Sequence, residues 1–426
     1  MQPEDRLYQM YLQILNEELM PAMGCTEPIA IAYAAARAKN VLNETVIRGE
    51  ISVSGNIIKN VKSVIVPNTD GLKGIEAAAA AGIVAGNAEK VLEVISEVSE
   101  EQKQEIRRFL QNTPFHVQPS DSEDQLDIDI TLYSASGSAR VRITGSHTNI
   151  VLIMKDGEIL YRSGETGPAA KEAITDRSQL SVERIVEFAN CLRIEDVQEV
   201  LGRQIAYNMA IAEEGLRHPY GACVGRILLS QDGESMKNKA KAYAAAGSDA
   251  RMSGCELPVI INSGSGNQGI TVSVPLIIYA RERQIPQDTL YRALALSNLI
   301  AIHQKTGIGR LSAYCGAVSA GCGAGCGIAY MEGADYRGIA HTLVNALAIV
   351  SGIVCDGAKP SCAAKIASSV EAGIFGWQMY QAGQQFYGGD GILSKGVENT
   401  IHNVCRLGRD GMRETDREII RIMTGC

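Results

Sequence analysis

Five of the eleven cysteines fall within residues 314–362, and these thiols are the side chains best suited to metal chemistry. The same stretch is rich in glycine and alanine, so its backbone can pack closely around a bulky inorganic group. Thiolates are soft ligands that suit zinc or iron–sulfur clusters. We therefore expect three of them, with Cys315, Cys355 and Cys362 as candidates, to hold a [4Fe–4S] cluster with one iron open for substrate.

Spacing alone leaves the ligand set open. Cys355 and Cys362 share a loop that contains glycine and proline, so both sulfurs can turn towards one cluster. Cys315 stands as far before Cys355 as Cys322 stands before Cys362, and either could be the third ligand. No compact C-x-x-C run is present, so zinc is the rival metal. Cysteines in tightly packed helices can also be small core residues.

A second group of candidate residues surrounds Cys25, which follows a glycine and precedes an alanine-rich helix. Thr26 can cap this helix and Pro28 suits its first turn. A helix N-terminus lowers the pKa of a thiol and favours a bound anion. The sequence therefore predicts that Cys25, Thr26 and Glu27 contact the substrate, with a plain capped helix start as the alternative.

A third candidate is the loop 263–269, whose glycines let successive backbone N–H groups converge ahead of a helix. We predict that it cradles a carboxylate, although an ordinary turn between helices would have a similar sequence. It is not a P-loop, because Gly-Lys-Ser/Thr is missing. The predicted substrate-binding residues of this loop are Ser263, Gly264, Ser265, Gly266 and Asn267.

Several single residues have weaker claims. Lys359 could steady a negative cluster or a substrate carboxylate, and His303 and Lys305 could be acid–base groups. Asp249 and Arg251 are interpreted as an ion pair at a helix end, with a place in the lining of the site as the alternative.

Two features elsewhere receive other interpretations. Residues 145–148 are expected only to join two strands. Cys426, the last residue, could reach the open iron.

The elements that must position these residues fall into two groups. Hydrophobic periodicity predicts a helical catalytic domain formed by residues 1–43 and 166–426, and an inserted α/β domain, 44–165, with a mainly antiparallel sheet. The expected fold class is therefore α+β. The expected strands are 45–53, 61–66, 126–132, 139–143 and 149–154, and the expected helices include 4–20, 29–39, 71–86, 90–111, 194–213, 235–254 and 270–279.

Composition narrows the class of protein. With 426 residues, a hydrophobic content of 46% and a net charge of -8, the chain can bury a large core and is unsuited to gripping nucleic acid. It has no apolar run of about 18 residues that could span a membrane. Its first residues do not form a signal peptide, so we expect a cytoplasmic protein with reduced thiols. The expected partner is a small amino acid, and a homodimer is compatible with these features.

Three motifs together resemble a known family: residues 24–28, 263–269 and 354–362 are similar to those of the L-cysteine desulfidases. That family is related to the α-chain of iron–sulfur L-serine dehydratases. The resemblance implies an enzyme with a [4Fe–4S] cluster and no pyridoxal phosphate, which converts L-cysteine to pyruvate, ammonia and hydrogen sulfide. By position, it implies Cys315, Cys355 and Cys362 as ligands, with Cys25 as an alternative to Cys362.

The resemblance also implies a mechanism of β-elimination. The open iron would bind the substrate sulfur, residues 263–266 would hold the carboxylate, and Cys25 as a thiolate would remove the Cα proton. His303 and Glu27 are weaker candidates for this base. The rival functions are an L-serine dehydratase, a regulatory protein that binds a metal or an amino acid without turnover, and a purely structural helical protein.

Overall fold

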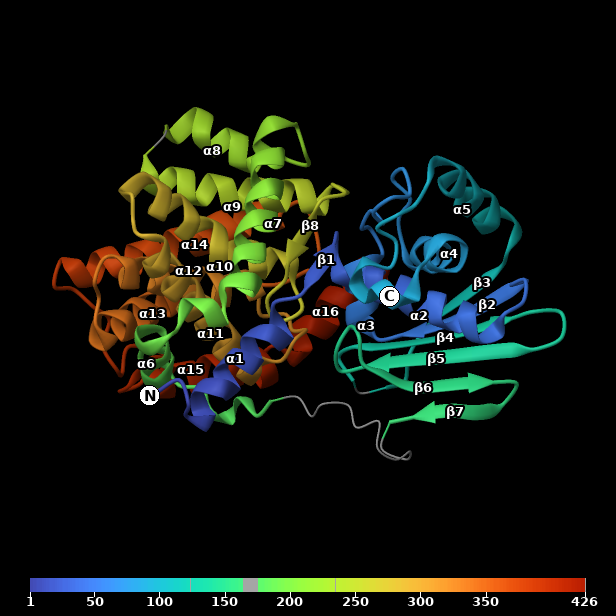
Figure 1. Ribbon diagram of the computed structural model, residues 1–426, viewed down its shortest axis with the longest axis horizontal. Coiled ribbons are helices and arrows are strands. Elements are labelled where there is room, and N and C mark those ends of the chain that lie inside the picture. The colour runs from blue at the N-terminus through green and yellow to red at the C-terminus, as the bar shows by residue number, and fades with distance from the viewer. Residues whose placement is uncertain (123, 164–174, 234, 426) are drawn as a thin grey trace.

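The computed structural model describes residues 1–122, 124–163, 175–233 and 235–425. Figure 1 shows an α/β part beside a larger helical part. This arrangement confirms the predicted α+β class. The α/β part contains β2 (Arg48–Val53), β3 (Phe115–Pro119), β4 (Asp127–Tyr133), β5 (Ser138–Thr144), β6 (Ile150–Lys155), β7 (Glu158–Arg162), α2 (Thr26–Leu42), α3 (Gly55–Val61), α4 (Ile75–Ala85), the 3-10 turn η1 (Ala88–Glu93) and α5 (Glu100–Asn112).

The six strands form one sheet in the order β3-β2-β4-β5-β6-β7, and only β2 and β3 run parallel. The sheet is therefore mainly antiparallel, as predicted. In β4 the side chains of Ile128, Ile130 and Leu132 are fully buried, and they alternate with more polar residues, as a strand with one covered face requires. Helices α2 and α4 pack together, and α2 covers β4 and β5.

Two predicted elements of this part are wrong. Residues 61–66 do not form a strand. Val61 is the last residue of α3, and it is buried together with Ile57, one helical turn before it. Only Ile65 makes an isolated bridge. The helix predicted over 90–111 is also wrong at its start, because Ser99 forms a capping box that begins α5.

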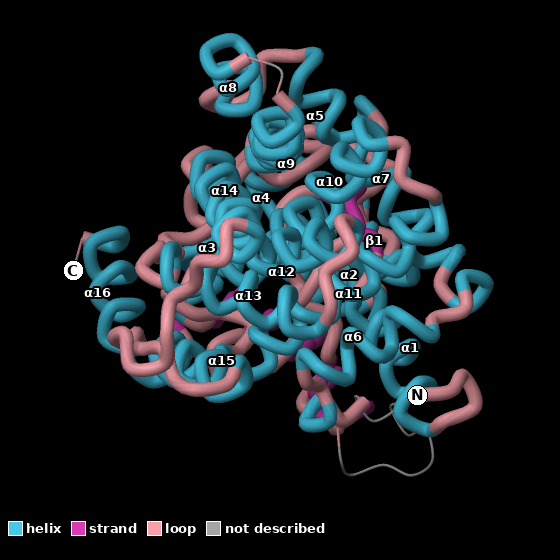
Figure 2. Tube along the Cα trace, turned by 90° about the vertical axis from the view of Figure 1, so that its left-hand side faces the viewer, coloured by secondary structure: helices cyan, strands magenta, loops and turns pink. Residues whose placement is uncertain are grey.

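The helical part is built around α12 (Figure 2). Gly321 and Gly325 let α12 approach α14 so closely that a Cβ on either glycine would collide with the backbone of α14. The helices of this part are α1 (Arg6–Glu18), α6 (Val182–Cys191), α7 (Gln198–Arg217), α8 (Val224–Asp232), α9 (Met236–Met252), α10 (Gly266–Arg283), α11 (Gln287–Ile308), α12 (Gly316–Met331), α13 (Tyr336–Val350), α14 (Cys362–Gln381), α15 (Val397–Arg406) and α16 (Arg413–Thr424), with short turns η2 (Arg177–Gln179), η3 (Ile194–Asp196) and η4 (Leu407–Gly411).

A short antiparallel pair joins the beginning of the chain to the helical part. Strand β1 (Pro21–Met23) pairs with β8 (Pro258–Ile260), so the loop before α2 lies beside the loop before α10. Helix α2 then packs on the α/β sheet, although the predicted boundary at residue 43 assigns it to the helical domain. The division into domains stays a prediction.

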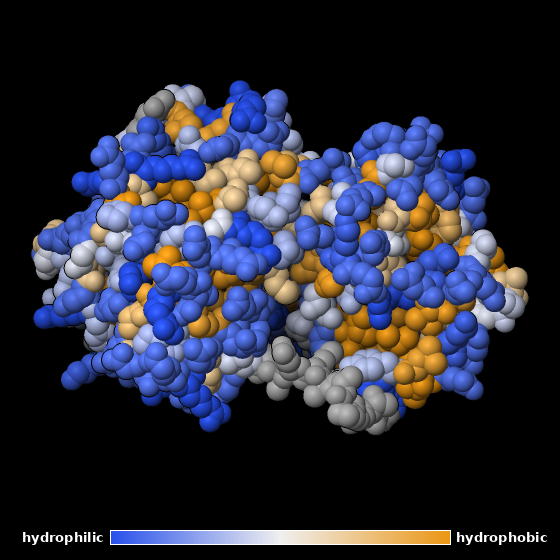
Figure 3. Space-filling view, in the orientation of Figure 1, coloured by the Kyte–Doolittle hydropathy of each residue, from blue (hydrophilic) through white to orange (hydrophobic). Residues whose placement is uncertain are grey.

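Hydrophobic residues gather on the lower part of the α/β surface in Figure 3. Ile159 and Leu160 of the edge strand β7 are among the exposed apolar side chains. No helix within the described residues is both long enough and apolar enough to cross a membrane.

Candidate active site

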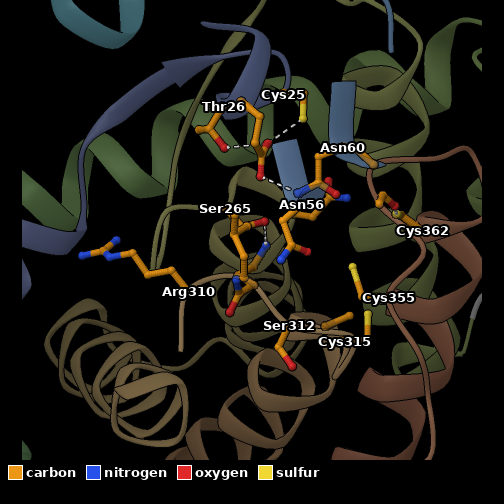
Figure 4. A pocket seen from close by; sticks show the side chains of 18 of the residues that line it. Cys25, Thr26, Asn56, Asn60, Ser265, Arg310, Ser312, Cys315, Cys355 and Cys362 are labelled. Atoms are coloured by element: carbon orange, nitrogen blue, oxygen red, sulfur yellow. Dashed lines mark hydrogen bonds between the residues drawn. The ribbon is translucent and has the colours of Figure 1, made fainter. Parts of the chain in front are cut away.

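Four helix N-termini converge on one cavity (Figure 4). Three of these helices begin directly after a residue that lines the cavity: Cys25 precedes α2, Ser265 precedes α10 and Cys315 precedes α12. The fourth helix, α14, begins at Cys362. Because each N-terminus carries a partial positive charge and free amide donors, the cavity favours anions.

Backbone pairing brings two of the predicted ligand thiols together. Tyr314 and Val354 form an isolated bridge, and the N–H of Cys355 donates to the carbonyl of Ala313 at 2.7 Å. Cys315 and Cys355 therefore lie next to each other on the cavity wall. A hydrogen bond between the two thiols lowers the pKa of Cys355 and raises that of Cys315.

The third predicted ligand, Cys362, lines the same cavity from the first turn of α14. Its sulfur accepts the backbone N–H of Lys359 at 3.5 Å. The alternative ligand Cys322 lies two turns inside α12, where it is fully buried and does not line the cavity. All these thiols are free, so none is lost to a disulfide.

The three thiols fit an iron–sulfur cluster better than a single metal ion. Within the described residues, no group of three His, Cys, Asp or Glu side chains is arranged to hold one ion. A cluster places each cysteine on a different iron, so its sulfurs stand further apart than the ligands of one ion. Cys315, Cys355 and Cys362 surround one cavity under helix N-termini that favour thiolates. The donor set therefore fits a cluster.

The opposite wall is built by α2 and α3 around the buried carboxylate of Glu27. Its Oε1 accepts the side-chain amide of Asn60 at 3.0 Å, and its Oε2 accepts the thiol of Cys25 at 2.9 Å. Thr26 donates its hydroxyl to the carbonyl of Gly264 at 2.7 Å, which ties α2 to the loop before α10.

These contacts fix the charge of both groups. Burial by itself raises the pKa of Glu27, but the interactions with His147 and the hydrogen bond from Cys25 outweigh burial and lower it to about 2. Burial, followed by the charge of Glu27, raises the pKa of Cys25 well above its ordinary value. Cys25 is therefore a thiol that donates to Glu27. This finding removes the premise that the helix N-terminus keeps Cys25 as a thiolate base.

Four cations line the cavity, Lys59, Arg251, Lys305 and Arg310, and they differ in their partners. Arg310 pairs with Glu18 at 2.9 Å. Lys59 forms a buried ion pair with Asp416 of α16. Lys305 is fully buried, and burial lowers its pKa to about 8; its Nζ has no side-chain partner among the described residues. Arg251 likewise has no carboxylate partner within that part of the chain.

Arg251 does not form the predicted pair with Asp249, which instead accepts the backbone N–H of Gly225 at 3.1 Å. Burial raises the pKa of Asp249 to about 6.

Only part of the predicted carboxylate cradle faces the cavity. Ser265 and Asn267 line it, whereas Ser263 donates its hydroxyl to Asn262. The N–H of Ser265 donates to the carbonyl of Asn262 and is not available to an anion. The anion-binding end of α10 is therefore its first turn, from Gly266 onwards.

Two other candidates, Lys359 and His303, do not line the cavity. The Nζ of Lys359 donates to the carbonyl of Lys59 at 3.3 Å. His303 pairs with Glu398 at 2.7 Å, on a different pocket, so it is not placed to act as the base. Cys426 lies outside the described residues.

Sequence reasoning missed two residues beside Glu27. Asn60 is on α3, directly before residues 61–66, which were predicted to be a strand. His147 is in the loop 145–148, which was expected only to join two strands. His147 is 4% exposed, its Nε2 lies 3.7 Å from Glu27 Oε1, and a Cβ on Gly264 would touch its ring. The signal in the sequence that could have identified His147 is a histidine in a short loop that contains glycine.

Comparison with known proteins agrees with this site. The family model described as "Serine dehydratase alpha chain" matches residues 89–421. The chain belongs to the serine dehydratase alpha chain family. This membership confirms the resemblance to the dehydratase α-chain that the motifs indicated. The matched range includes residues 263–269 and all three predicted ligand cysteines, while Cys25 and Glu27 lie before it.

Relatives within this serine dehydratase-like group cover the whole site. A UPF0597 protein of Desulfitobacterium hafniense is 60% identical over 99% of this chain and 98% of its own. UPF0597 proteins of Lachnoclostridium phytofermentans and Treponema denticola are 49% and 46% identical, each over 98% of this chain and over 100% and 98% of their own. These alignments span α2 as well as the thiols.

Proposed function

We propose that this serine dehydratase-like protein is an iron–sulfur L-cysteine desulfidase, a lyase that needs no pyridoxal phosphate. The observation that carries the proposal is the single cavity lined by Cys315, Cys355 and Cys362 on one side and by the ionised Glu27 on the other. One side suits a metal cluster and the other suits the ammonium of an amino acid. The resemblance to the desulfidases supplies L-cysteine as the substrate.

Cys315, Cys355 and Cys362 would hold a [4Fe–4S] cluster, which when bound supplies a Lewis acid for the leaving group. The chain around it favours negative charge. The N-termini of α12 and α14 point at the thiols, and Lys59 lines the same cavity from α3. These groups stabilise thiolates and the negative charge that grows as the carbon–sulfur bond breaks.

Glu27 holds the substrate by its ammonium group. The interactions with His147 and the hydrogen bond from Cys25 keep this carboxylate ionised, and the bonds from Cys25 and Asn60 fix its direction. An ionised, buried carboxylate is a strong hydrogen-bond acceptor for an ammonium ion. The substrate Cα would then lie between Glu27 and the thiol wall.

Lys305, as the neutral amine that its burial-lowered pKa of about 8 makes accessible, accepts the proton from Cα and becomes an ammonium ion. Its Nζ is buried, lines the cavity and has no side-chain partner among the described residues, so it is free to reach the substrate. The Cα–H electrons form the Cα–Cβ double bond, the Cβ–S bond breaks, and sulfur leaves with its electron pair. Water then converts the released aminoacrylate to pyruvate and ammonia.

L-serine is the competing substrate, because the family is that of the serine dehydratase alpha chain. The experiment incubates protein purified without oxygen with L-cysteine or L-serine, and measures pyruvate, ammonia and sulfide. We expect equal amounts of pyruvate and sulfide from L-cysteine, formed faster than pyruvate from L-serine. Faster pyruvate formation from L-serine would make the protein a dehydratase. Amino-acid binding without pyruvate would make it a non-catalytic binding protein.

A further inference from the structure

Arg251 is a buried cation whose counter-ion is missing from the described residues. It lies in the last turn of α9, is 4% exposed and lines the cavity. Its Nη1 donates to Asn267 Oδ1 at 3.1 Å, but its Nε has no hydrogen-bond partner. An unpaired buried ion costs several kcal/mol, so this guanidinium needs an anion from outside the chain.

The guanidinium lies directly against the N-terminus of α10. A Cβ on Gly266 would collide with Nε and Cζ of Arg251, so only glycine at this position allows the contact. Helix α10 has 18 residues. The Ser265 hydroxyl caps the N–H of Gln268, which leaves the N–H groups of Gly266 and Asn267 without a partner among the described residues. The unpartnered cation and the helix dipole therefore favour an anion at the same point.

Nearby carboxylates do not fill this place. Glu27 is bonded to Cys25 and Asn60, and no ion pair joins it to Arg251 among the described residues. The other arginine on the cavity wall, Arg310, is already paired with Glu18 at 2.9 Å. The anion that pairs with Arg251 therefore comes from the ligand.

We propose that Arg251, together with the first turn of α10, binds the α-carboxylate of the substrate. Glu27 on the opposite wall binds the α-ammonium, so the cavity selects free α-amino acids over amines that lack a carboxylate. This inference rests on the proposed function, and it moves the carboxylate from the cradle of residues 263–266 to a guanidinium. Arginine suits the task because its planar fork can donate two parallel hydrogen bonds to a carboxylate.

The test compares L-alanine with ethylamine, which differ by the carboxylate and cannot undergo elimination. Isothermal titration calorimetry measures both ligands on the iron-loaded protein and its variants. For the wild type we expect L-alanine to bind more tightly than ethylamine. Arg251→Gln should weaken L-alanine binding by about 100-fold, as the loss of a charge-assisted carboxylate contact predicts. Ethylamine binding should change by less than about threefold. Equal loss for both ligands, or no loss, would overturn the proposal.

Two further variants control the experiment. Arg251→Lys keeps the charge but not the planar guanidinium, and its affinity for L-alanine should fall by about tenfold. This variant also provides the test if Arg251→Gln does not fold. Arg310→Gln should shift both ligands alike, because its guanidinium is neutralised by Glu18. A loss confined to L-alanine in Arg310→Gln would assign the carboxylate to Arg310 instead.

Binding is measured without turnover, so the two proposals can fail separately. Carboxylate-dependent binding without sulfide release from L-cysteine would contradict the proposed function and leave Arg251 in place. Sulfide release from L-cysteine, together with an unchanged preference of Arg251→Gln for L-alanine over ethylamine, would contradict the role of Arg251 and leave the proposed function in place.

Discussion

The two walls of the cavity come from different parts of the fold and differ in charge. The helical part contributes three thiols, two of them at the N-termini of α12 and α14, together with Lys305 and Arg251. The wall formed by α2 and α3 contributes the carboxylate of Glu27. Elimination from an amino acid needs both: one side must accept negative charge, and the other must hold the ammonium. The comparison predicts that changes on the two walls have separable effects on iron content and on substrate binding.

The largest effect is expected on the thiol wall. Cys355→Ala should abolish sulfide release, with at least a 1,000-fold loss as expected for an essential catalytic group, and should remove the iron, because it deletes one of three cluster ligands. Iron content and sulfide release are measured on protein prepared without oxygen. A colourless but fully active variant would contradict the role of this thiol.

Lys305→Gln should separate catalysis from metal binding. The turnover number should fall by roughly 100- to 10,000-fold, the range typical of a lost general base, while iron content stays at the wild-type level. Steady-state kinetics and iron analysis on the same sample check this expectation. Unchanged turnover would remove Lys305 as the proton acceptor.

A smaller effect is expected on the opposite wall. Glu27→Gln should lower kcat/KM for L-cysteine by about 100-fold, mainly through KM, because it removes the charge that holds the ammonium. Iron should be retained. Loss of iron in this variant would mean that the two walls are not independent.

The same variant makes a prediction about stability. The pKa of Glu27 is lowered to about 2 in the folded protein from an ordinary value of 4.5, so its contribution to stability is present above pH 4.5 and is lost as pH falls through 2. The contribution is about 3 kcal/mol. Acid denaturation followed by circular dichroism should show a shallower loss between these pH values in Glu27→Gln.

The smallest effect is expected inside α12. Cys322→Ala should keep the iron and the activity, and should destabilise the protein by about 1 kcal/mol, because it removes a buried sulfur from a packed helix. Thermal unfolding and iron analysis provide the measurement. Loss of iron would return Cys322 to the ligand set in place of Cys315.

Local sequence patterns predicted much of this arrangement. The alternation in β4 and the glycine before α2 are local signals, and they were interpreted correctly as a strand and as a helix N-terminus. Helix α10 begins at Gly266, inside the segment that was expected to be a loop. Cys315 and Cys355 could not be placed together by spacing, because the bridge between Tyr314 and Val354 joins segments far apart in the chain.

The errors have physical causes as well. Asp249 and Arg251 are two residues apart on a helix, and such residues do not face each other, so the predicted pair could not form. Cys25 was expected to be a thiolate from its helix position alone, but burial beside Glu27 outweighs the helix dipole. His147 reaches Glu27 through the packing of α2 on the sheet, a contact between segments far apart in the chain.

The most direct test of the central claim is the iron and acid-labile sulfide content of the protein after oxygen-free purification, with an absorption spectrum recorded before and after L-cysteine is added. We expect about four iron and four sulfide per chain, and a spectral change on adding L-cysteine. A protein free of iron, or one containing only zinc, that releases sulfide from L-cysteine at an undiminished rate would contradict the account.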